Sequence, residues 1–346
     1  MPSTLQYSAS ESGNKPLVSV IIPAYDAAAY IQETLRSVFS QTYDNYEVIV
    51  VNDGSNDTAE LHCVLTPYLD RIVYVQQRNA GPSAARNTGI RHARGDYLAF
   101  LDSDDRWLPD SLASQVAFAF SNEPPYDLVY GDMLLVADPL ANPHGKGREI
   151  RYFDKCPSVG EVNFASLLME QCQVPTSGSM LRRELAIRAG LFDEELRRAE
   201  DYGLWLRVAH QGASMAFHRN VVGVYRVRDT SLSSDNIAML ESAATVLKKL
   251  DRLPSLSPSD RSVLNQKLQD LSTLVELERG KVALLKGNYR DAICSLASAN
   301  AIKGSWRVSC AIYSLKLVPN LMGPLLQLLI RGSSRRSQRL RVVNGY

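Results

Sequence analysis

Four short apolar runs, separated by segments of helical spacing, most constrain how this chain can fold. The runs are too short for helices and cover Leu17–Ile22, Tyr46–Val51, Ile72–Val75 and Tyr97–Leu101. The helices predicted between them cover Ala27–Ser40, Thr58–Tyr68 and Ala84–Ala93. Strands that alternate with helices pair in parallel, because each crossover helix returns the chain to the same end of the sheet. The pattern therefore predicts an α/β fold with a mostly parallel central sheet flanked by helices.

The rest of the chain divides at about Ile237, where strand signals stop and helical signals continue. Before that point we expect helices at Pro109–Phe120, Met180–Ala189 and Glu200–Gln211, strands at Leu128–Val136 and Ser214–Tyr225, and an irregular excursion at Ala137–Val159. We therefore predict a disordered lead-in (1–15), an α/β domain (16–236), a helical C-terminal region (237–330) and a basic tail (331–346).

Residues 271–300 resemble one tetratricopeptide-type helical hairpin. The expected turn is Lys286-Gly287-Asn288, and the apolar face after it is Tyr289, Ala292, Ile293 and Leu296. A single hairpin does not establish a repeat array. The other interpretation is a helical appendage that covers apolar surface on the α/β domain or on a partner subunit, the second case giving a homo-oligomer.

Composition excludes some classes of protein. Charge is nearly balanced, with 38 Lys and Arg against 37 Asp and Glu, so no nucleic-acid partner is expected. The five cysteines are scattered without a C-x-x-C pair, which argues against a zinc site or disulfide framework and favours a reducing compartment. The polar N-terminus lacks a signal-peptide core, and no uncharged apolar stretch reaches the roughly 18–20 residues of a membrane span. We expect a cytoplasmic protein, either free or peripheral at the inner face of the membrane.

The C-terminal end is basic. No acidic residue follows Asp291, whereas the basic residues after it are Lys303, Arg307, Lys316, Arg331, Arg335, Arg336, Arg339 and Arg341. This asymmetry favours an anionic surface such as lipid headgroups as a peripheral contact. The alternative is an ordinary solvated basic tail.

Three carboxylates, Asp102, Asp104 and Asp105, follow the strand predicted at Tyr97–Leu101. Like charges this close repel one another unless a cation or strong donors compensate. Oxygen ligands at the carboxyl end of a parallel strand suit a hard divalent ion, Mg²⁺ or Mn²⁺. The alternative is a solvated acidic turn before the helix that begins near Pro109.

Three strand ends should lie side by side, and they carry Pro23-Ala24-Tyr25-Asp26, Asn52-Asp53-Gly54-Ser55 and Leu101-Asp102-Ser103-Asp104-Asp105. An acid beside an aromatic ring suits a pyrimidine nucleotide, because Asp53 can accept the imide N–H and Tyr25 can cover the base. A metal at Asp104 and an arginine, Arg78 or Arg86, would neutralise a diphosphate. Each feature alone also has a structural explanation, such as a common Asp-Gly turn.

Together these stretches resemble the successive motifs of the family-2 glycosyltransferases, which have the GT-A fold. The resemblance is almost unbroken from Leu17 to about Phe120 and resumes at the Glu200-Asp201 motif, whose sequence is AEDYGLWLR. Tyr225-Arg226, followed by Ser231-Leu232-Ser233, resembles the motif that closes the catalytic domain. The motifs are specific to the family and far less specific to any substrate.

The resemblance implies roles at matching positions. Asp53 would hold the base, Asp102 would contact the ribose, Asp104 would bind the divalent ion, and Asp201 would be the general base of a single inverting displacement. The implied nucleotide-binding set is Pro23, Ala24, Tyr25, Asp53, Arg78, Arg86, Asp102, Ser103 and Arg228.

Two assignments remain to be made: which acid of the Glu200-Asp201 motif is the general base, and what Arg228 binds. Glu200 and Asp201 point about 100° apart on a helix, so both cannot face one acceptor, and we assign the base to Asp201. The alternative for this pair is an acidic first turn favoured by the helix dipole. Many relatives have a His at the position of Arg228, which cannot ligate a cation but can pair with phosphate, so we expect Arg228 to reach the diphosphate.

The predicted function is metal-dependent, inverting transfer of a sugar from a nucleotide donor, expected to be UDP-linked, to a glycan or lipid-linked acceptor in cell-envelope polysaccharide synthesis. A sugar-nucleotide or nucleotidyl transferase, which also places carboxylates and metal on such a sheet, is the main enzymatic alternative. A non-catalytic nucleotide-sugar-binding module is the alternative from another class. The donor sugar, acceptor and linkage are not readable from the sequence.

Overall fold

The computed structural model describes residues 15–138, 150–228 and 235–338. Its contacts divide the chain into two compact units. The first contains the sheet and runs to Val136, then includes Lys146–Arg197 and Leu204–Arg226. The second contains Arg198–Gly203 and the C-terminal helices from Val227 on.

The first half of the sheet is parallel, as the alternating pattern predicts. Its order is β3-β2-β1-β4, and its strands are β1 (Val18–Ala24), β2 (Tyr46–Asn52), β3 (Val73–Gln76) and β4 (Tyr97–Phe100). The intervening helices are α1 (Ile31–Phe39), α2 (Thr58–Leu65), which continues as a 3₁₀ turn at Thr66–Tyr68, and α3 (Pro82–His92). All four strands and the three helices between them are where the sequence predicts them, within a few residues.

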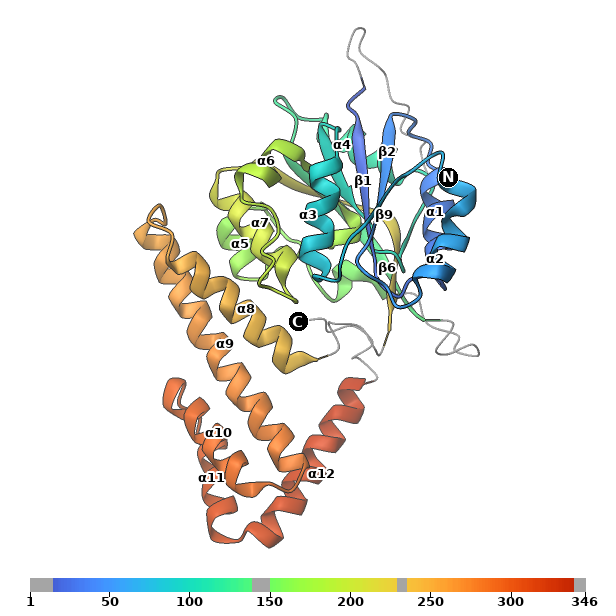
Figure 1. Cartoon of the computed structure of the whole chain (residues 1–346). Coiled ribbons are helices and arrows are strands. Elements are labelled where there is room, and N and C mark those ends of the chain that lie inside the picture. The colour runs from blue at the N-terminus through green and yellow to red at the C-terminus, as the bar shows by residue number, and fades with distance from the viewer. Residues whose placement is uncertain (1–14, 139–149, 229–234, 339–346) are drawn as a thin grey trace, which may run out of the picture. The chain divides into compact units, whose positions relative to one another are not determined.

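The second half makes the sheet mixed. β8 (Ser179–Arg182) pairs antiparallel with both β4 and β6 (Leu128–Ala137), and β9 (Met215–Val227) pairs antiparallel with β5 (Arg106–Trp107). The full order is β3-β2-β1-β4-β8-β6-β9-β5, with β7 (Ile150–Arg151) beside β6. The helices of this half, seen flanking the strands in Figure 1, are α4 (Ser111–Ala119), α5 (Phe164–Leu168), α6 (Arg183–Arg188) and α7 (Glu200–His210).

The helix predicted at Met180–Ala189 is wrong in its first turn. Met180 and Leu181 belong to β8, and the helix, α6, begins only at Arg183. Both side chains are fully buried, because β8 lies between β4 and β6. A short apolar run fits a buried strand or a buried helix equally well, and tertiary pairing decides between them. The predicted irregular excursion contains β7 and lies partly, at 139–149, outside the described residues.

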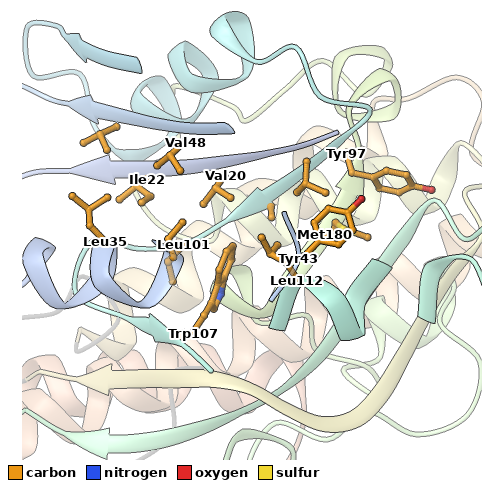
Figure 2. Packing of buried hydrophobic residues seen from close by; sticks show 14 of the residues in the cluster. Val20, Ile22, Leu35, Tyr43, Val48, Tyr97, Leu101, Trp107, Leu112 and Met180 are labelled. Atoms are coloured by element: carbon orange, nitrogen blue, oxygen red, sulfur yellow. The ribbon is translucent and has the colours of Figure 1, made fainter. Parts of the chain in front are cut away.

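Both faces of β1 are buried, which holds the site elements firmly. Val20 and Ile22 pack in one cluster with Leu35 of α1 and with Trp107, as Figure 2 shows. On the opposite face, Ile21 contacts α3 at Gly89, where an added Cβ would lie 2.5 Å from the Ile21 Cγ2 atom. Only glycine allows α3 to lie this close to the sheet, and the close approach sets the position of the whole helix.

The C-terminal unit is helical, as predicted. Its helices are α8 (Asn236–Asp251), α9 (Pro258–Leu285), α10 (Tyr289–Ile302), α11 (Trp306–Leu317) and α12 (Pro319–Gln338). Asp235, Ser257 and Asn288 accept hydrogen bonds from the first turns of α8, α9 and α10, which explains where these helices begin. Helices α9, α10 and α11 share a core that includes Leu284, Ala292, Leu296, Ile312 and Leu315, and α12 packs against it.

The predicted hairpin face is the face that packs. Ala292 and Leu296 are buried, and Tyr289 and Ile293 pack partly buried against the same cluster. Whether the hairpin is a tetratricopeptide unit stays a prediction. Within the described residues, every helix is too short or too polar to span a bilayer.

Candidate active site

The end of β2 is joined to the end of β1 by a backbone hydrogen bond. The Asp53 N–H donates to the carbonyl of Ala24 (2.9 Å), and Pro23 and Ala24 pair in register with Val51 and Asn52. Gly54 follows with φ +64°, and an added Cβ there would lie 2.6 Å from the backbone nitrogen of Asn79. The Asp-Gly turn therefore needs glycine both for its backbone angle and for the close approach of the next loop.

The Asp53 carboxylate binds the loop that follows β3, residues 77–81. It accepts hydrogen bonds from the Gln77 side chain (2.7 Å) and from the backbone N–H groups of Ala80 (2.9 Å) and Gly81 (2.8 Å). Arg78 is exposed within this loop, and Asp53 itself is buried. Asp53 thus fixes the segment that carries Arg78, and a carboxylate has about four lone-pair positions, so one further donor can still bind. Its role toward the nucleotide base stays a prediction.

Tyr25 directly follows β1 and is about half exposed. Its hydroxyl accepts a hydrogen bond from the Asn56 side chain (3.1 Å), whose amide also donates to Asp26 (3.0 Å). Asp26 has φ +49°, and its other carboxylate oxygen accepts the Asn56 N–H (2.7 Å). The Tyr25 ring is therefore held at the end of the sheet with open surface, an arrangement that suits stacking on a planar ligand.

Asp102 forms an ion pair with Arg86 of α3. Arg86 Nη2 lies 2.7 Å from Asp102 Oδ1, and the two side chains are 6% and 31% exposed. The Arg86 guanidinium also lies over the Phe192 ring, 5.4 Å from its centroid. Gly89, one turn further along α3, brings the helix onto β1, so the close packing at Gly89 is what places Arg86 against Asp102.

Asp105 points into the protein instead of toward the carboxyl end of the sheet. Its carboxylate accepts hydrogen bonds from the Ser177 hydroxyl (2.6 Å) and the Arg226 N–H (2.9 Å), and it is 2% exposed. Burial raises the pKa of Asp105 well above its ordinary value, and the charges of Asp104 and Asp102 raise it further. The three carboxylates that follow β4 therefore do not act as one set of ligands, because consecutive residues of this turn face different surroundings.

Arg226 of β9 holds the backbone that carries Asp104. Its Nε donates to the Asp104 carbonyl (2.9 Å), while its guanidinium pairs with Glu33 of α1 (2.7 Å). The Thr34 hydroxyl is within hydrogen-bond distance of the carbonyls of Ser103 (2.8 Å) and Asp105 (2.7 Å). Helix α1 and strand β9 thus fix the turn, and the half-buried Asp104 side chain is positioned by backbone contacts on both sides.

Comparisons with known proteins give the same assignment as the motifs. A family model described as glycosyl transferase family 2 matches residues 19–156. An uncharacterized glycosyltransferase of Rickettsia typhi is 30% identical over 241 residues, which are 68% of this chain and 73% of that protein. The chain belongs to glycosyl transferase family 2. The putative teichuronic acid biosynthesis glycosyltransferase TuaG of Bacillus subtilis is 29% identical over 69% of this chain and 90% of its own length.

Some relatives in the family are much longer. An uncharacterized glycosyltransferase of Rickettsia felis is 32% identical over 195 residues, and the match spans 56% of this chain but 31% of that protein. The chain therefore matches about a third of the length of such relatives.

Solved structures show that the fold is GT-A-like. The S. aureus TarS 1–349 structure has a TM-score of 0.60 at 19% identity and covers 91% of each chain. The mannosyltransferase PcManGT from Pyrobaculum calidifontis, solved with GDP-Man and Mn²⁺, has a TM-score of 0.57 at 20% identity and covers 91% of this chain and 84% of its own. At these identities the likeness concerns the fold alone.

The family-2 acid motif begins helix α7. Trp205 of α7 packs against Phe100 of β4, with ring centroids 6.2 Å apart, and Leu204, Leu206 and Val208 are buried. Asp201 lies one helical turn before Trp205 and accepts the Tyr202 N–H (2.7 Å), whereas Glu200 is buried. Asp201 and Arg228 fall in the second unit, so their roles beside the nucleotide stay predictions.

The described carboxylates do not by themselves form a cage for a divalent cation. Across the residues that the structure describes, no group of three or more His, Cys, Asp or Glu side chains could hold a metal ion. Mg²⁺ is nonetheless usually bound through one or two carboxylates together with substrate phosphates, not by an all-protein cage. Asp104, which follows β4 at the carboxyl end of the sheet, fits that kind of partial site as a single carboxylate ligand.

Three supporting residues were missed by sequence reasoning. Ser177 accepts the Asp102 N–H (3.1 Å) and donates to Asp105, and its carbonyl accepts the Trp107 indole N–H (2.6 Å). No pattern marks Ser177, because its partners lie 70 or more positions away. Arg226 belongs to the Tyr-Arg motif, which could have indicated it, whereas Glu33 resembles any exposed helical acid.

Proposed function

We propose that this family-2 member is a metal-dependent, inverting glycosyltransferase. It transfers a sugar from a UDP-linked donor to a hydroxyl of a glycan or lipid-linked acceptor, in the synthesis of a cell-envelope polysaccharide. The proposal rests on one observation: Tyr25, Asp53 and the segment Asp102–Asp104 all lie at the carboxyl ends of three adjacent parallel strands. Open α/β sheets bind their ligands at this edge.

Two named proteins support the details of the substrates. A TarS structure contains UDP-GlcNAc, which supports a UDP-sugar donor. TuaG is named for teichuronic acid biosynthesis, which supports a cell-envelope acceptor.

The nucleotide-binding residues would act through the ends of β1, β2 and β4. Tyr25 stacks on the base, and Asp53 accepts its N–H while holding the loop of Arg78. Asp102, oriented by its ion pair with Arg86, accepts a hydrogen bond from a ribose hydroxyl. Arg78 and Arg228 are the cations that would pair with the diphosphate, because guanidinium groups bind phosphate oxygens in a bidentate manner.

The departing diphosphate carries the negative charge that develops in the reaction. A divalent cation, held by Asp104 and the diphosphate oxygens, would offset this charge. Arg226 and Thr34 keep the Asp104 backbone in place, so the carboxylate needs little reorganisation on binding.

Asp201 would take the proton of the acceptor hydroxyl. The acceptor oxygen then forms its bond to the anomeric carbon while the bond from that carbon to the phosphate oxygen breaks on the opposite face, which inverts configuration in one step. One carboxylate suffices because no covalent intermediate forms. Trp205, packed against Phe100, would hold the helix that aims this acid.

The test is a panel of nucleotide sugars, with and without Mn²⁺ or Mg²⁺, in which release of the nucleoside diphosphate is followed. We expect release from a UDP-sugar that depends on the added cation. Asp201→Asn should bind the donor with unchanged Kd and release almost no nucleotide, because the base is lost and the fold is not. Glu200→Gln is the matched control on the same helical turn and should remain active.

Each other result has a definite meaning. Wild-type turnover in Asp201→Asn would place the base elsewhere, and loss of turnover in Glu200→Gln alone would place it on Glu200. Donor binding without any nucleotide release would indicate a binding module. Release of pyrophosphate from a nucleoside triphosphate would indicate a nucleotidyl transferase. An unchanged donor KM in Arg228→Ala would remove Arg228 from the diphosphate site.

A further inference from the structure

Exposed apolar side chains are concentrated on α11 and α12, the two helices at the C-terminal end of the described residues. Figure 1 labels both helices. Eight large hydrophobic residues between positions 306 and 329 are strongly exposed: Trp306, Tyr313, Leu317, Val318, Leu321, Leu325, Leu328 and Leu329. Scattered exposed hydrophobic residues are normal in a folded protein, but a contiguous group of this kind marks an interaction surface.

On α11 the exposed apolar residues form one stripe. Trp306, Tyr313 and Leu317 are 73%, 65% and 79% exposed and recur at the spacing of one helix face. Ile312 and Leu315 occupy the opposite face and are buried in the core of the unit. One face of α11 therefore packs in the core of the unit, and a second apolar face is exposed.

α12 repeats this arrangement. Leu321, Leu325 and Leu328 are 70%, 48% and 66% exposed on one face, while Leu326 and Ile330 pack inward against the core. The residues from Pro319 to Ile330 include no charged side chain at all. The two exposed stripes meet where α11 joins α12, because Leu317 and Val318 are also exposed.

The charged residues of α11 and α12 are all basic. Arg307 and Lys316 project about 100° to either side of the α11 stripe and are both exposed. No Asp or Glu occurs after Asp291, and the sequence after Ile330 adds Arg331, Arg335, Arg336, Arg339 and Arg341. An apolar stripe with Trp and Tyr, flanked on both sides by basic residues, is the pattern of a helix that lies in a membrane interface.

We propose that the exposed face of α11 and α12 binds the surface of an anionic lipid bilayer, with the leucines and Trp306 inserted among the lipids and the basic residues at the phosphate groups. A second copy of the chain fits less well, because a self-complementary contact through these two helices would bring basic residues against basic residues, with no acid on either helix to offset them. The proposal concerns the helical unit and does not depend on the sugar-transfer function.

The test is cosedimentation of the full-length protein with vesicles. Equimolar phosphatidylglycerol and phosphatidylcholine vesicles should bind the protein, phosphatidylcholine alone should bind it much more weakly, and added salt should release it. Each basic residue near an anionic surface strengthens binding by about fivefold, so Arg307→Gln with Lys316→Gln should weaken it about 25-fold. Leu321→Gln with Leu328→Gln should weaken it by about tenfold or more.

Control pairs remove exposed residues of the same chemical kind elsewhere in the chain. Arg188→Gln with Lys248→Gln controls for charge, and Met169→Gln with Ile187→Gln controls for exposed apolar residues. All variants change surface positions, so each should keep the wild-type melting temperature, which is measured alongside. Neither control pair should alter vesicle binding.

Three outcomes would overturn the proposal. The first is wild-type protein that does not sediment with the anionic vesicles. The second is sedimentation that both variant pairs leave unchanged. The third is a protein that is a dimer without lipid, by light scattering, and becomes a monomer when Leu321 and Leu328 are replaced, since the face would then be a contact between copies.

Discussion

The ion pair between Arg86 and Asp102 leads to a prediction that can be measured without knowing the substrate. The two charged atoms are 2.7 Å apart, the Arg86 side chain is 6% exposed, and the Asp102 side chain is 31% exposed. Unit charges about 4 Å apart attract by about 4 kcal/mol at an effective dielectric constant of 20. Desolvation of the guanidinium and the partial exposure of Asp102 offset part of this, so we expect a coupling of about 2 kcal/mol.

A double-mutant cycle measures this coupling. The variants are Asp102→Asn, Arg86→Met and both together, and the unfolding free energy of each is obtained from urea titrations. Asp102→Asn should cost about 2–3 kcal/mol, because it leaves a charged guanidinium in a buried position. The double variant should cost clearly less than the sum of the two single variants.

The readout should report the first unit alone. Trp107 and Trp205 are buried in that unit, and Trp306 is exposed on the second. A Trp306→Phe background therefore restricts the fluorescence signal to the sheet. A coupling below about 0.5 kcal/mol would refute the reasoning, because the pair would then contribute no more than a surface salt bridge.

Three further predictions concern stability and metal dependence. Burial lowers the pKa of His218 to about 4. The free energy of unfolding should therefore fall by up to about 3 kcal/mol as the pH drops from about 6.5 to about 4. In urea titrations across this pH range, His218→Leu should remove that fall. The sign follows because the unfolded chain takes up a proton that the folded chain excludes. Gly54→Ala should cost about 2–3 kcal/mol, since it combines a positive φ with a contact to the Asn79 backbone, and a melting temperature unchanged from wild type would contradict this. Asp104→Asn should raise the cation concentration for half-maximal activity about tenfold or more, which a Mn²⁺ titration of nucleotide release would measure and an unchanged titration would disprove.

The sheet and its helices could be predicted from Leu17 to Phe100, because each element there shows its own local periodicity. β1 is apolar on both faces, α1 has the spacing of an amphipathic helix, and α3 begins with a proline, which favours a helix start. The family motifs also identified the residues at the strand ends. Both signals depend only on neighbouring positions in the chain, so no tertiary information was needed.

Contacts between distant segments decided the rest. Met180 and Leu181 form a strand because β4 and β6 lie on either side of them, which no local pattern indicates. Asp105 is drawn inward by Ser177 and Arg226, although its sequence position suggested a ligand beside Asp104.

The sequence alone determined the order of strands and helices and the types of residue at the sheet edge, because these follow from short-range pattern. Only the tertiary structure decided which carboxylate faces inward, which arginine pairs with Asp102, and which leucines of α12 stay exposed. Apolar residues on both faces of a helix look the same in sequence, since burial depends on what packs against each face.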